Sequence, residues 1–288
     1  MKKIAVFPKT SAIAGKPVMA AFIESLQGED YVICENHERP DADVVVMWSW
    51  LLGMYGRDAI YNHYKNTHTK FIILEVGALK RNTSWKVAIN GINRDADFGN
   101  QSVDDNRLSM FDLVPYPWHQ GGDHIIVCGQ NERSIAWNQG NMAQWANSMV
   151  DWIRSQTDRP IWFRPHPRFP VHFAEAQEKK IFVSQPKRIK LVGSTDEVDF
   201  AQALTRAHAV VNYNSNPAIE SVLAGVPVYV DESSLCWTVG NPIGSDIENP
   251  AKPDRTEWLK QISYTEWFVE EIKQGLPWKR LKPRLIAG

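Results

Sequence analysis

The sequence predicts an α/β protein built from two Rossmann-like domains. Three observations carry this prediction: short apolar runs alternate with helical patterns, the alternation stops in a long polar middle segment, and it then starts again. A chain of 288 residues is long enough for two such domains of about 100–150 residues each. Hydrophobic residues make up 43% of the chain, which is enough for two sizeable cores.

The first half of the chain is expected to form one parallel sheet with helical connections. Its apolar runs have the length and the Val and Ile content of buried strands. The predicted strands span residues 4–7, 31–34, 44–47, 71–74 and 86–89, and a helix is expected over 18–26. Parallel sheets bind ligands at the carboxyl ends of their strands. The residues expected at such ends are Thr10, Ser11, Trp48, Ser49 and Glu75.

The middle of the chain, residues 90–122, is rich in Asn, Asp, Gly and Pro and lacks apolar periodicity. Loops of this length usually link domains or carry function. Residues 115–118, Pro-Tyr-Pro-Trp, and the pair Gly121-Gly122 predict a hinge. We therefore expect a first domain over residues 1–118 and a second over 119–264.

The second half repeats the pattern of strands and helices. Strands are expected at 125–128, 161–163, 181–183, 190–192, 209–211 and 228–230, and helices over 142–154 and 197–206. After the strand at 209–211 comes a polar turn, residues 212–216, which we call the elbow. Asn216 is a favourable N-cap, Pro217 suits the first helical position, and Gly225 is expected to end the helix. The crossover makes the two flanking strands parallel neighbours.

The elbow is a candidate anion site. Free backbone N–H groups at a helix N-terminus attract anions, and here the side chains of Asn214, Ser215 and Asn216 flank them. Glu220 falls in the first helical turn, where its charge suits the helix dipole and its oxygens can accept two sugar hydroxyls. The alternative is a capped helix in an ordinary α/β domain.

A second candidate site follows the strand predicted at 161–163. This segment reads Arg164-Pro-His166-Pro-Arg168, and its two prolines stiffen it. Arg presents forked donors that match phosphate oxygens, so two guanidinium groups with an imidazole between them suit a phosphate or pyrophosphate. The alternative is a surface turn whose arginines pair with carboxylates.

Composition excludes several other classes of function. The net charge is −1, so the chain as a whole is not drawn to nucleic acid or anionic membranes. Its 3 cysteines lie far apart and predict neither a disulfide framework nor a zinc site. Pro8 and Lys9 interrupt the N-terminal apolar run, which excludes a secretion signal, and no run is long enough to cross a membrane. We expect a cytoplasmic protein without a membrane partner.

Two segments carry a resemblance to a known superfamily. Residues 164–168, RPHPR, and 214–228, NSNPAIESVLAGVPV, resemble the donor-site motifs of GT-B glycosyltransferases, whose two Rossmann-like domains face each other across a cleft. Residues 75–81 with Trp85, and residues 264–275, resemble segments of bacteriophage GT-B enzymes that glycosylate DNA. The resemblance implies that a UDP-linked sugar, a hexose or a pentose, is moved to 5-hydroxymethylpyrimidine in phage DNA. It also implies that helices at 255–261 and 265–274 return to the first domain, with 265–288 packed on it.

The resemblance further implies which residues hold the donor. The elbow would bind the diphosphate, and Glu220 would bind the ribose hydroxyls. The neighbourhood of residues 189–191 would bind the nucleobase. The implied donor-binding residues are Gly129, Gln130, Arg164, His166, Arg168, Asn214, Ser215, Asn216 and Glu220. No cofactor and no metal site is expected, because GT-B enzymes offset the charge of the leaving group with Arg, Lys and helix termini.

An inverting displacement needs a general base that takes the proton of the acceptor hydroxyl. The candidate is Glu75, after the strand predicted at 71–74, and Asp97, Asp104 and Asp105 are alternatives. In the noncatalytic alternative, Glu75 caps a helix or pairs with Arg81. A reaction that retains the anomeric configuration would need no such general base. The candidates for acceptor binding are Ser11, Trp48 and Arg81.

Basic clusters and the 12 tryptophans bear on DNA as the acceptor. One cluster consists of Lys187, Arg188 and Lys190, and the other consists of Lys279, Arg280, Lys282 and Arg284. The alternative interpretation is that these charges only form a solvated surface and bind no nucleic acid. A tryptophan can replace a flipped base in the stack, and the candidates are Trp48, Trp50, Trp85 and Trp118. The other functions left open are a surface-polysaccharide glycosyltransferase, a UDP-sugar epimerase of similar fold and a noncatalytic nucleotide-binding module.

Overall fold

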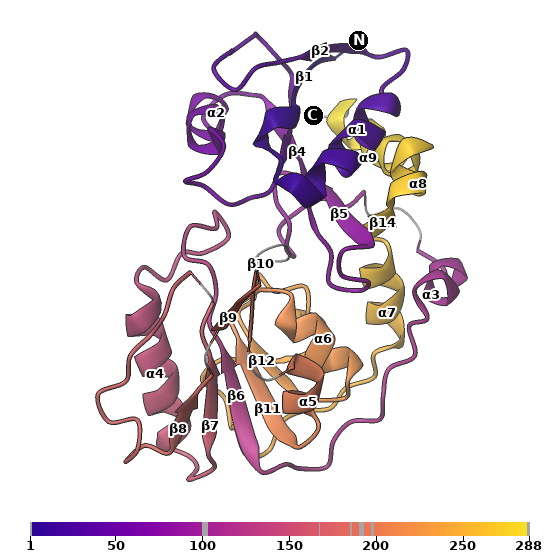
Figure 1. Cartoon of the computed structure of the whole chain (residues 1–288). Coiled ribbons are helices and arrows are strands. Elements are labelled where there is room, and N and C mark those ends of the chain that lie inside the picture. Colours follow the sequence, from indigo (N-terminus) through magenta and orange to yellow (C-terminus); the bar gives the residue numbers. More distant parts are fainter. Residues whose placement is uncertain are drawn as a thin grey trace. The chain divides into compact units, whose positions relative to one another are not determined.

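The structure is a computed structural model that describes residues 2–99, 103–166, 168–184, 186–189, 193–196 and 199–286 (Figure 1). It divides into two compact units. Unit 1 comprises Met1–Asp112, Arg133–Ala136 and Leu259–Gly288, and unit 2 comprises Leu113–Glu132 and Trp137–Trp258. The chain therefore leaves unit 1 after Asp112, whereas the sequence suggests that the first domain ends at residue 118.

The sheet of unit 1 has six strands in the order β14-β5-β4-β3-β1-β2. They are β1 (Lys3–Phe7), β2 (Asp30–Ile33), β3 (Val44–Trp48), β4 (Lys70–Val76), β5 (Ser84–Ile89) and β14 (Glu266–Phe268). The pairs among β1 to β4 are parallel, as predicted. The prediction of an all-parallel sheet is wrong for β5, which runs antiparallel to β4. The connection over residues 77–83 is too short for the crossover that parallel strands need.

Helices cover both faces of this sheet. They are α1 (Lys16–Glu24), α8 (Val269–Lys273) and α9 (Leu276–Ile286) on one face and α2 (Arg57–Tyr64) on the other. Side chains alternate along each strand, so Val44 and Val46 pack toward α1, whereas Val45 and Met47 pack toward α2. Coverage on both sides explains why the central strands are apolar at every position.

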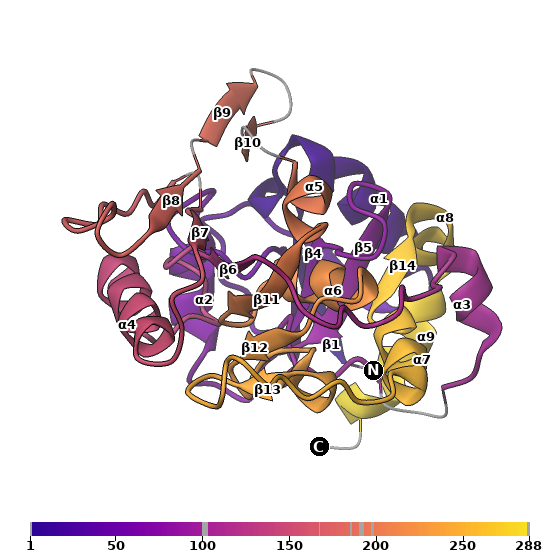
Figure 2. The same cartoon turned by 90° about the horizontal axis from the view of Figure 1, so that it is seen from below.

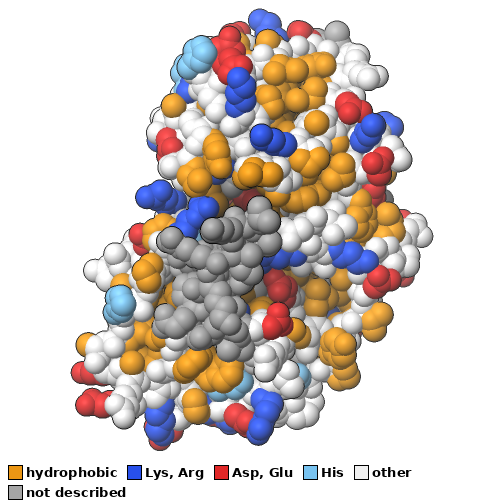
Figure 3. Space-filling model, in the orientation of Figure 1, with side chains coloured by type: hydrophobic (Ala, Val, Ile, Leu, Met, Phe, Trp, Pro, Cys, Tyr) orange, Lys and Arg blue, Asp and Glu red, His pale blue; other side chains and the backbone are white. Residues whose placement is uncertain are grey.

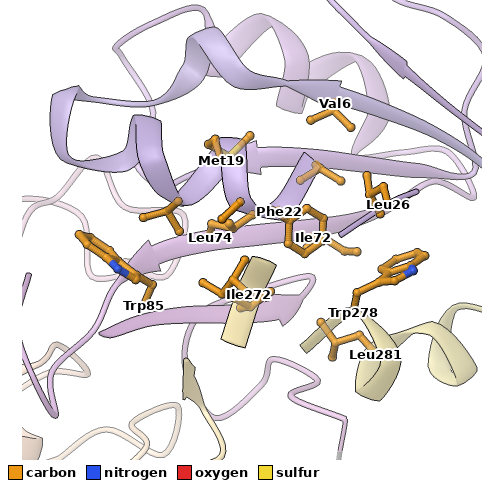
Figure 4. Packing of buried hydrophobic residues seen from close by; sticks show 14 of the residues in the cluster. Val6, Met19, Phe22, Leu26, Ile72, Leu74, Trp85, Ile272, Trp278 and Leu281 are labelled. Atoms are coloured by element: carbon orange, nitrogen blue, oxygen red, sulfur yellow. The ribbon is translucent and has the colours of Figure 1, made fainter. Parts of the chain in front are cut away.

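The C-terminal helices complete the core of unit 1. Phe22 of α1 meets Ile272 of α8 and Trp278 and Leu281 of α9 (Figure 4), and all four are at most 5% exposed. The Trp278 and Phe22 rings contact edge to face, with their centroids 6.3 Å apart. Residues of the C-terminal segment therefore belong to the same hydrophobic cluster as the first helix of the chain.

The predicted helix over 265–274 is wrong in its first half. Residues Glu266–Phe268 form β14, which pairs antiparallel with β5, and only α8 follows as a helix. Glu266 is fully buried, and its carboxylate accepts hydrogen bonds from Ala78 N–H (2.6 Å) and Ser84 Oγ (2.6 Å). At Gly77 a Cβ atom would lie 2.2 Å from Glu266 Oε2, so glycine is required beside this carboxylate. A long-range polar contact thus overrides the local helical pattern.

The main sheet of unit 2 has six parallel strands in the order β13-β12-β11-β6-β7-β8. They are β6 (His124–Cys128), β7 (Ile161–Arg164), β8 (Ile181–Val183), β11 (Ala207–Asn212), β12 (Val228–Val230) and β13 (Asn241–Pro242). The strands predicted at 181–183 and 228–230 are confirmed, and β6, β7 and β11 extend the predicted ones by one to three residues. The strand predicted at 190–192 lies outside the described residues.

Helices of unit 2 are α4 (Met142–Arg154), α5 (Phe200–Leu204) and α6 (Pro217–Leu223). The prediction of α4 is confirmed, and α4 packs its apolar side on β6, β7 and β11. A separate antiparallel hairpin is formed by β9 (Pro186–Ile189) and β10 (Gly193–Asp196). Figure 2 shows this hairpin apart from the main sheet of unit 2.

The segment predicted as a hinge is bound to unit 2. Tyr116 N–H donates to Leu223 O (2.9 Å), and His119 N–H donates to Gly225 O (2.7 Å). Gly225 has a φ of +79°, and a Cβ atom there would lie 2.1 Å from Pro117 O. Glycine at this position therefore both ends α6, as predicted, and lets the segment over 115–118 pass closely.

The remaining helices are α3 (Asn106–Phe111) and α7 (Thr256–Ser263), with the short 3₁₀ turns η1 (Pro8–Thr10), η2 (Ile13–Gly15) and η3 (Trp237–Val239). Within the described ranges, no helix has the length and apolar character that a membrane crossing requires.

A buried ion pair attaches α3 to the C-terminal segment of unit 1. Arg107 Nη1 lies 2.5 Å from Glu271 Oε1, and both side chains are at most 10% exposed. The guanidinium also donates to the carbonyl oxygens of Ser263 (2.9 Å) and Glu266 (2.7 Å) and lies 4.1 Å from the centroid of the Trp267 ring. All sides of this buried cation are thus engaged.

We expect Arg107→Ala to lower the free energy of unfolding by about 3–5 kcal/mol, because it leaves Glu271 as a buried charge without its cation. Arg284→Ala is the matched control, since Arg284 pairs with Asp97 at the surface of the same unit. That control should cost no more than about 1 kcal/mol. Urea denaturation followed by tryptophan fluorescence measures both, and equal costs would contradict this account of the buried pair.

Candidate functional site

Three neighbouring strands of unit 2 end at the same level. Asn212, the last residue of β11, is in register with Cys128 of β6, and Cys128 is in register with Arg164 of β7. Because the strands are parallel, the segments that follow them emerge from one edge of the sheet. This edge brings together the elbow, Gly129 and Gln130, and the segment that starts at Arg164.

Asn212 determines the shape of the elbow. Its side chain is fully buried, its Oδ1 accepts a hydrogen bond from Ser215 N–H (2.8 Å), and its Nδ2 donates to Ser215 Oγ (2.8 Å). Asn216 occupies the N-cap position of α6, but its side chain makes no capping hydrogen bond. The prediction of Asn216 as the capping side chain is therefore wrong, because Asn212 already orders this turn from the strand side.

The elbow has fewer open N–H groups than the sequence suggests. Ser215 N–H is used by Asn212, Ala218 N–H donates to Ser215 O (3.2 Å), and Pro217 has no N–H. Asn214 N–H points to Gln130 Oε1 at the long distance of 3.4 Å. The expectation of several free amides must be corrected, since the turn satisfies most of its own donors.

Gln130 and Asn214, a residue of the elbow, bind each other. Gln130 Nε2 donates to Asn214 Oδ1 (2.8 Å), and Asn214 Nδ2 donates to Ser233 Oγ (2.8 Å), which donates in turn to Asp231 Oδ1 (2.6 Å). Gln130 is 6% exposed and Asn214 is 4% exposed. These two predicted donor-binding residues thus use their side chains to hold the elbow in place.

Tyr213 belongs to the same support. Its hydroxyl donates to Asn138 Oδ1, and its ring contacts the Trp137 ring edge to face with centroids 5.1 Å apart. Burial raises the pKa of the Tyr213 phenol, so it stays protonated and remains a donor.

Gly129 and the segment after β7 lie directly side by side. Gly129 N–H donates to Arg164 O (2.8 Å), and a Cβ atom on Gly129 would be 3.1 Å from His166 N. The Arg164 guanidinium lies 5.0 Å from the centroid of the Phe200 ring, in a cation–π geometry. The Arg168 side chain is exposed, and its backbone N–H donates to His166 Nδ1 (3.2 Å). The structure therefore assembles Gly129, Arg164 and His166 at one strand edge, with Arg168 just beyond.

Glu220 lies in the first turn of α6, as predicted, and is half-buried. The region predicted to bind the nucleobase of the donor, residues 189–191, lies outside the described side chains. The side chains of the basic cluster at Lys187, Arg188 and Lys190 lie outside them too.

A second cluster forms at strand ends in unit 1, around Glu75. The Glu75 Oε2 atom accepts hydrogen bonds from Ser49 Oγ (2.7 Å) and Trp50 N–H (3.3 Å), and Oε1 accepts one from Val76 N–H (2.8 Å). Glu75 is half-buried near the end of β4, and Ser49 directly follows β3. The sequence-based alternative of a pair with Arg81 is not what holds this carboxylate, because its described partners are Ser49 and two backbone amides.

Two of the three residues predicted for acceptor binding lie in the interior. Trp48 is 3% exposed and packs on Trp85, with ring centroids 5.6 Å apart, and on Gly15. Ser11 is 5% exposed, and its hydroxyl donates to Pro8 O (2.7 Å). The prediction of Trp48 and Ser11 as contact residues must be corrected, because strand alternation and the turn after β1 direct them inward. Arg81 is exposed in the turn between β4 and β5.

Sequence reasoning missed Arg57, which organises this cluster from within. The residue is 3% exposed, and its guanidinium donates to Thr10 O (3.0 Å) and Leu51 O (2.9 Å). It thereby ties the turn after β1 to the turn after β3. In the sequence, Arg57 is notable only because it follows Gly56 at the start of α2. Such a position does not indicate a functional residue.

The three aspartates named as alternative bases are engaged in structural contacts. Asp97 pairs with Arg284 (2.8 Å), Asp104 accepts from Tyr264 Oη (2.8 Å), and Asp105 lies 3.4 Å from Lys260 Nζ. The hydrogen bond from Tyr264 is the main cause that lowers the pKa of Asp104. Two Asp-x-Asp sequences occur, at 41–43 and 95–97, and Asp43 and Asp97 use their carboxylates on Lys3 N–H and Arg284.

One loop contributes to both clusters. Residues Arg133–Ala136 belong to unit 1, although the residues on either side belong to unit 2. Within unit 1, Ile135 N–H donates to Trp50 O (3.0 Å) and Leu52 N–H donates to Arg133 O (3.0 Å). Gln130, at the start of the same loop, holds the elbow of unit 2.

Among the described residues, most of the features that suggested DNA are buried or paired with other groups. Trp48, Trp50 and Trp85 are buried. The Arg255 guanidinium carbon lies 4.0 Å from the centroid of the Trp118 ring, and Trp118 Nε1 donates to Pro253 O (2.9 Å). In the basic cluster of α9, Lys282 pairs with Glu29 (2.5 Å), Arg284 pairs with Asp97, and Arg280 donates to Phe98 O (3.2 Å). Among the described residues on the face drawn in Figure 3, basic side chains are scattered between acidic and apolar ones.

We expect Asn212→Ala to lower the free energy of unfolding of unit 2 by about 1–3 kcal/mol, because it removes the buried side-chain amide that binds both the N–H and the hydroxyl of Ser215. The matched control is Asn249→Ala, an exposed asparagine of the same unit, which should change stability by less than about 0.5 kcal/mol. Urea denaturation compares the two. If both variants unfold alike, Asn212 is not what orders the elbow.

Comparison with known proteins supports the fold. No family model matches the chain, and no curated protein matches its sequence. Among solved structures, the chain is similar to Thermosulfurimonas dismutans KpsC, beta Kdo 2,7 transferase, with a TM-score of 0.56 and 12% identity over 97% of this chain and 99% of that one. It is also similar to KpsC, beta Kdo 2,4 transferase, of the same organism, with a TM-score of 0.53 and 12% identity over 96% and 98% of the two chains. The prediction of a two-domain, Rossmann-like fold is confirmed, and two glycosyltransferases share this fold, whereas a likeness to phage DNA glycosyltransferases is not shown.

Proposed function

We propose that this protein is a glycosyltransferase that moves a sugar from a nucleotide sugar to a hydroxyl group of a bacterial surface polysaccharide. The observation that carries the proposal is the likeness to two Kdo transferases, which runs through 97% and 96% of the chain and so spans both units. The sequence-based alternative of a polysaccharide acceptor accords with these neighbours better than DNA does. The paired basic residues of α9 and the buried tryptophans argue in the same direction.

In this proposal unit 2 binds the donor. Because the elbow uses most of its own amides, we assign the donor phosphate mainly to Arg164 and His166, with Arg168 at the outer edge. Arg164 suits this role because its planar guanidinium presents forked donors that match phosphate oxygens, and its contact with the Phe200 ring orients the group. Ser215, Asn216 and Glu220 would form hydrogen bonds with the other polar groups of the nucleotide or the sugar.

Unit 1 supplies the general base. Glu75 would accept the proton of the acceptor hydroxyl while that oxygen attacks the anomeric carbon, and the bond from this carbon to the phosphate oxygen breaks with its electron pair on the nucleotide. Each carboxylate oxygen has two lone pairs, so the hydrogen bonds from Ser49, Trp50 and Val76 leave acceptor capacity for that proton. UDP as the nucleotide, inversion at the anomeric carbon and independence of metal ions are further parts of this proposal.

The function is tested with the purified full chain and labelled donors, namely several UDP-sugars and nucleotide-activated Kdo. Each donor is offered with oligosaccharides from bacterial surface polysaccharides, with duplex DNA that contains 5-hydroxymethylpyrimidine, or with no acceptor. We expect label to move to an oligosaccharide. Transfer to DNA would overturn the acceptor class, and donor interconversion without acceptor would indicate an epimerase. Binding without any turnover would indicate a noncatalytic module.

Glu75→Gln should reduce transfer by at least about 100-fold and leave donor affinity within about twofold, because it removes proton acceptance and keeps the shape of the side chain. Asp104→Asn is the control, since Asp104 is an exposed carboxylate of the same unit that bonds Tyr264. Single-turnover rates and calorimetric affinities measure both properties. Turnover near that of wild type in Glu75→Gln would remove Glu75 from the mechanism.

Glu220→Ala should weaken nucleotide binding by about 10-fold or more, which is the typical loss of one hydrogen bond to a charged group. Its first-turn position at the end of the elbow is the reason for this expectation. Glu178→Ala, at an exposed site of the same unit, is the matched control. Isothermal titration calorimetry with UDP decides the question, and equal affinities of the two variants would exclude Glu220 from the donor site.

A further inference from the structure

Ser49 has an unusual backbone conformation directly after β3. Its φ is +67°, which residues other than Gly, Asn and Asp seldom adopt, and the residue is 2% exposed. The Ser49 N–H donates to Leu74 O (2.7 Å), which extends the pairing of β3 with β4 by one residue. The conformation is therefore held firmly by the neighbouring strand.

The side chain explains why serine occupies this strained position. Ser49 Oγ donates to Glu75 Oε2 (2.7 Å) and accepts from Leu51 N–H (3.3 Å). Glycine would adopt the same φ without steric cost but would leave Glu75 without the hydroxyl. A strained residue whose side chain holds a carboxylate at a strand end is typical of functional sites.

We propose that Ser49 is a positioning residue that fixes the Glu75 carboxylate for proton transfer. The Glu75 side chain has three rotatable bonds, and the contacts from Ser49 Oγ and Trp50 N–H restrain one of its oxygens from two directions. Without the hydroxyl, only the long contact from Trp50 N–H (3.3 Å) remains on that oxygen. This inference rests on the proposed role of Glu75 as the base, and it adds the residue that orients it.

Two substitutions separate the hydroxyl from the backbone strain. Ser49→Gly and Ser49→Ala both remove the hydroxyl, but only glycine relieves the cost of a positive φ. We expect Ser49→Gly to melt at a higher temperature than Ser49→Ala, and both to show the same loss of about 10- to 100-fold in kcat with a donor KM within about twofold of wild type. Thermal denaturation and steady-state kinetics measure these quantities. If Ser49 were merely structural, activity would follow stability, and Ser49→Gly would be the more active of the two.

The Glu75→Gln background distinguishes this inference from the proposed function. If Ser49 acts through Glu75, adding Ser49→Gly to Glu75→Gln causes no further loss of kcat. A slow Glu75→Gln variant beside a fully active Ser49→Gly variant would overturn the positioning role alone, whereas an active Glu75→Gln variant would overturn the base itself. A crystal structure of Ser49→Gly gives a readout that needs no substrate. We expect the Glu75 carboxylate to leave its contact with Trp50 N–H there, and an unmoved carboxylate would contradict the inference.

Discussion

Parallel pairing of β7, β6 and β11 brings Arg164, Cys128 and Asn212 to one level of the sheet in unit 2, and the candidate donor site depends on this register. A shift by one residue would turn every side chain of a strand to the opposite face. Asn212 would then leave Ser215, and Arg164 would leave the ring of Phe200. The apolar contacts of α4 with these strands hold the register, so the core of unit 2 and its polar edge are built by the same pairing.

The two strand-end clusters use polar groups differently. In unit 2, buried amides bond one another, and the resulting network of Gln130, Asn214 and Ser233 makes the elbow rigid. In unit 1, a single half-buried carboxylate is held by a hydroxyl and two backbone amides, and these three hydrogen bonds leave one of its four lone pairs. The first arrangement suits recognition of a fixed shape, whereas the second suits proton transfer. This contrast is a reason to seek the donor in one unit and the base in the other.

Sequence reasoning succeeded where local pattern and burial coincide. The runs that became β3, β4, β6 and β11 are apolar because helices cover both faces of their sheets, and α4 has a clear amphipathic period. It failed where a distant partner decides the structure. Residues 266–268 became a strand because the Glu266 carboxylate bonds the turn after β4, almost two hundred residues earlier in the chain.

The candidate site shows the same division. Arg164 and Glu75 were found because charged groups after apolar strands are conspicuous, and the elbow was found from its Asn, Ser and Pro residues. The use of the elbow amides by Asn212, the inward direction of Trp48 and the support from Arg57 depend on side-chain geometry that no spacing reveals. The positive φ of Ser49 is equally invisible, because serine is common in every kind of turn.

The return of residues 259–288 to unit 1 has a consequence for biosynthesis. A ribosome releases all of unit 2 before it releases β14, α8 and α9, so unit 1 waits with an unfinished sheet edge and an open apolar face on α1. During that interval the turn after β4 lacks its hydrogen bonds to the Glu266 carboxylate, and Phe22 lacks its ring contact with Trp278. The nascent chain is then most exposed to aggregation, and chaperones that shield apolar surface would act on its N-terminal third at this stage.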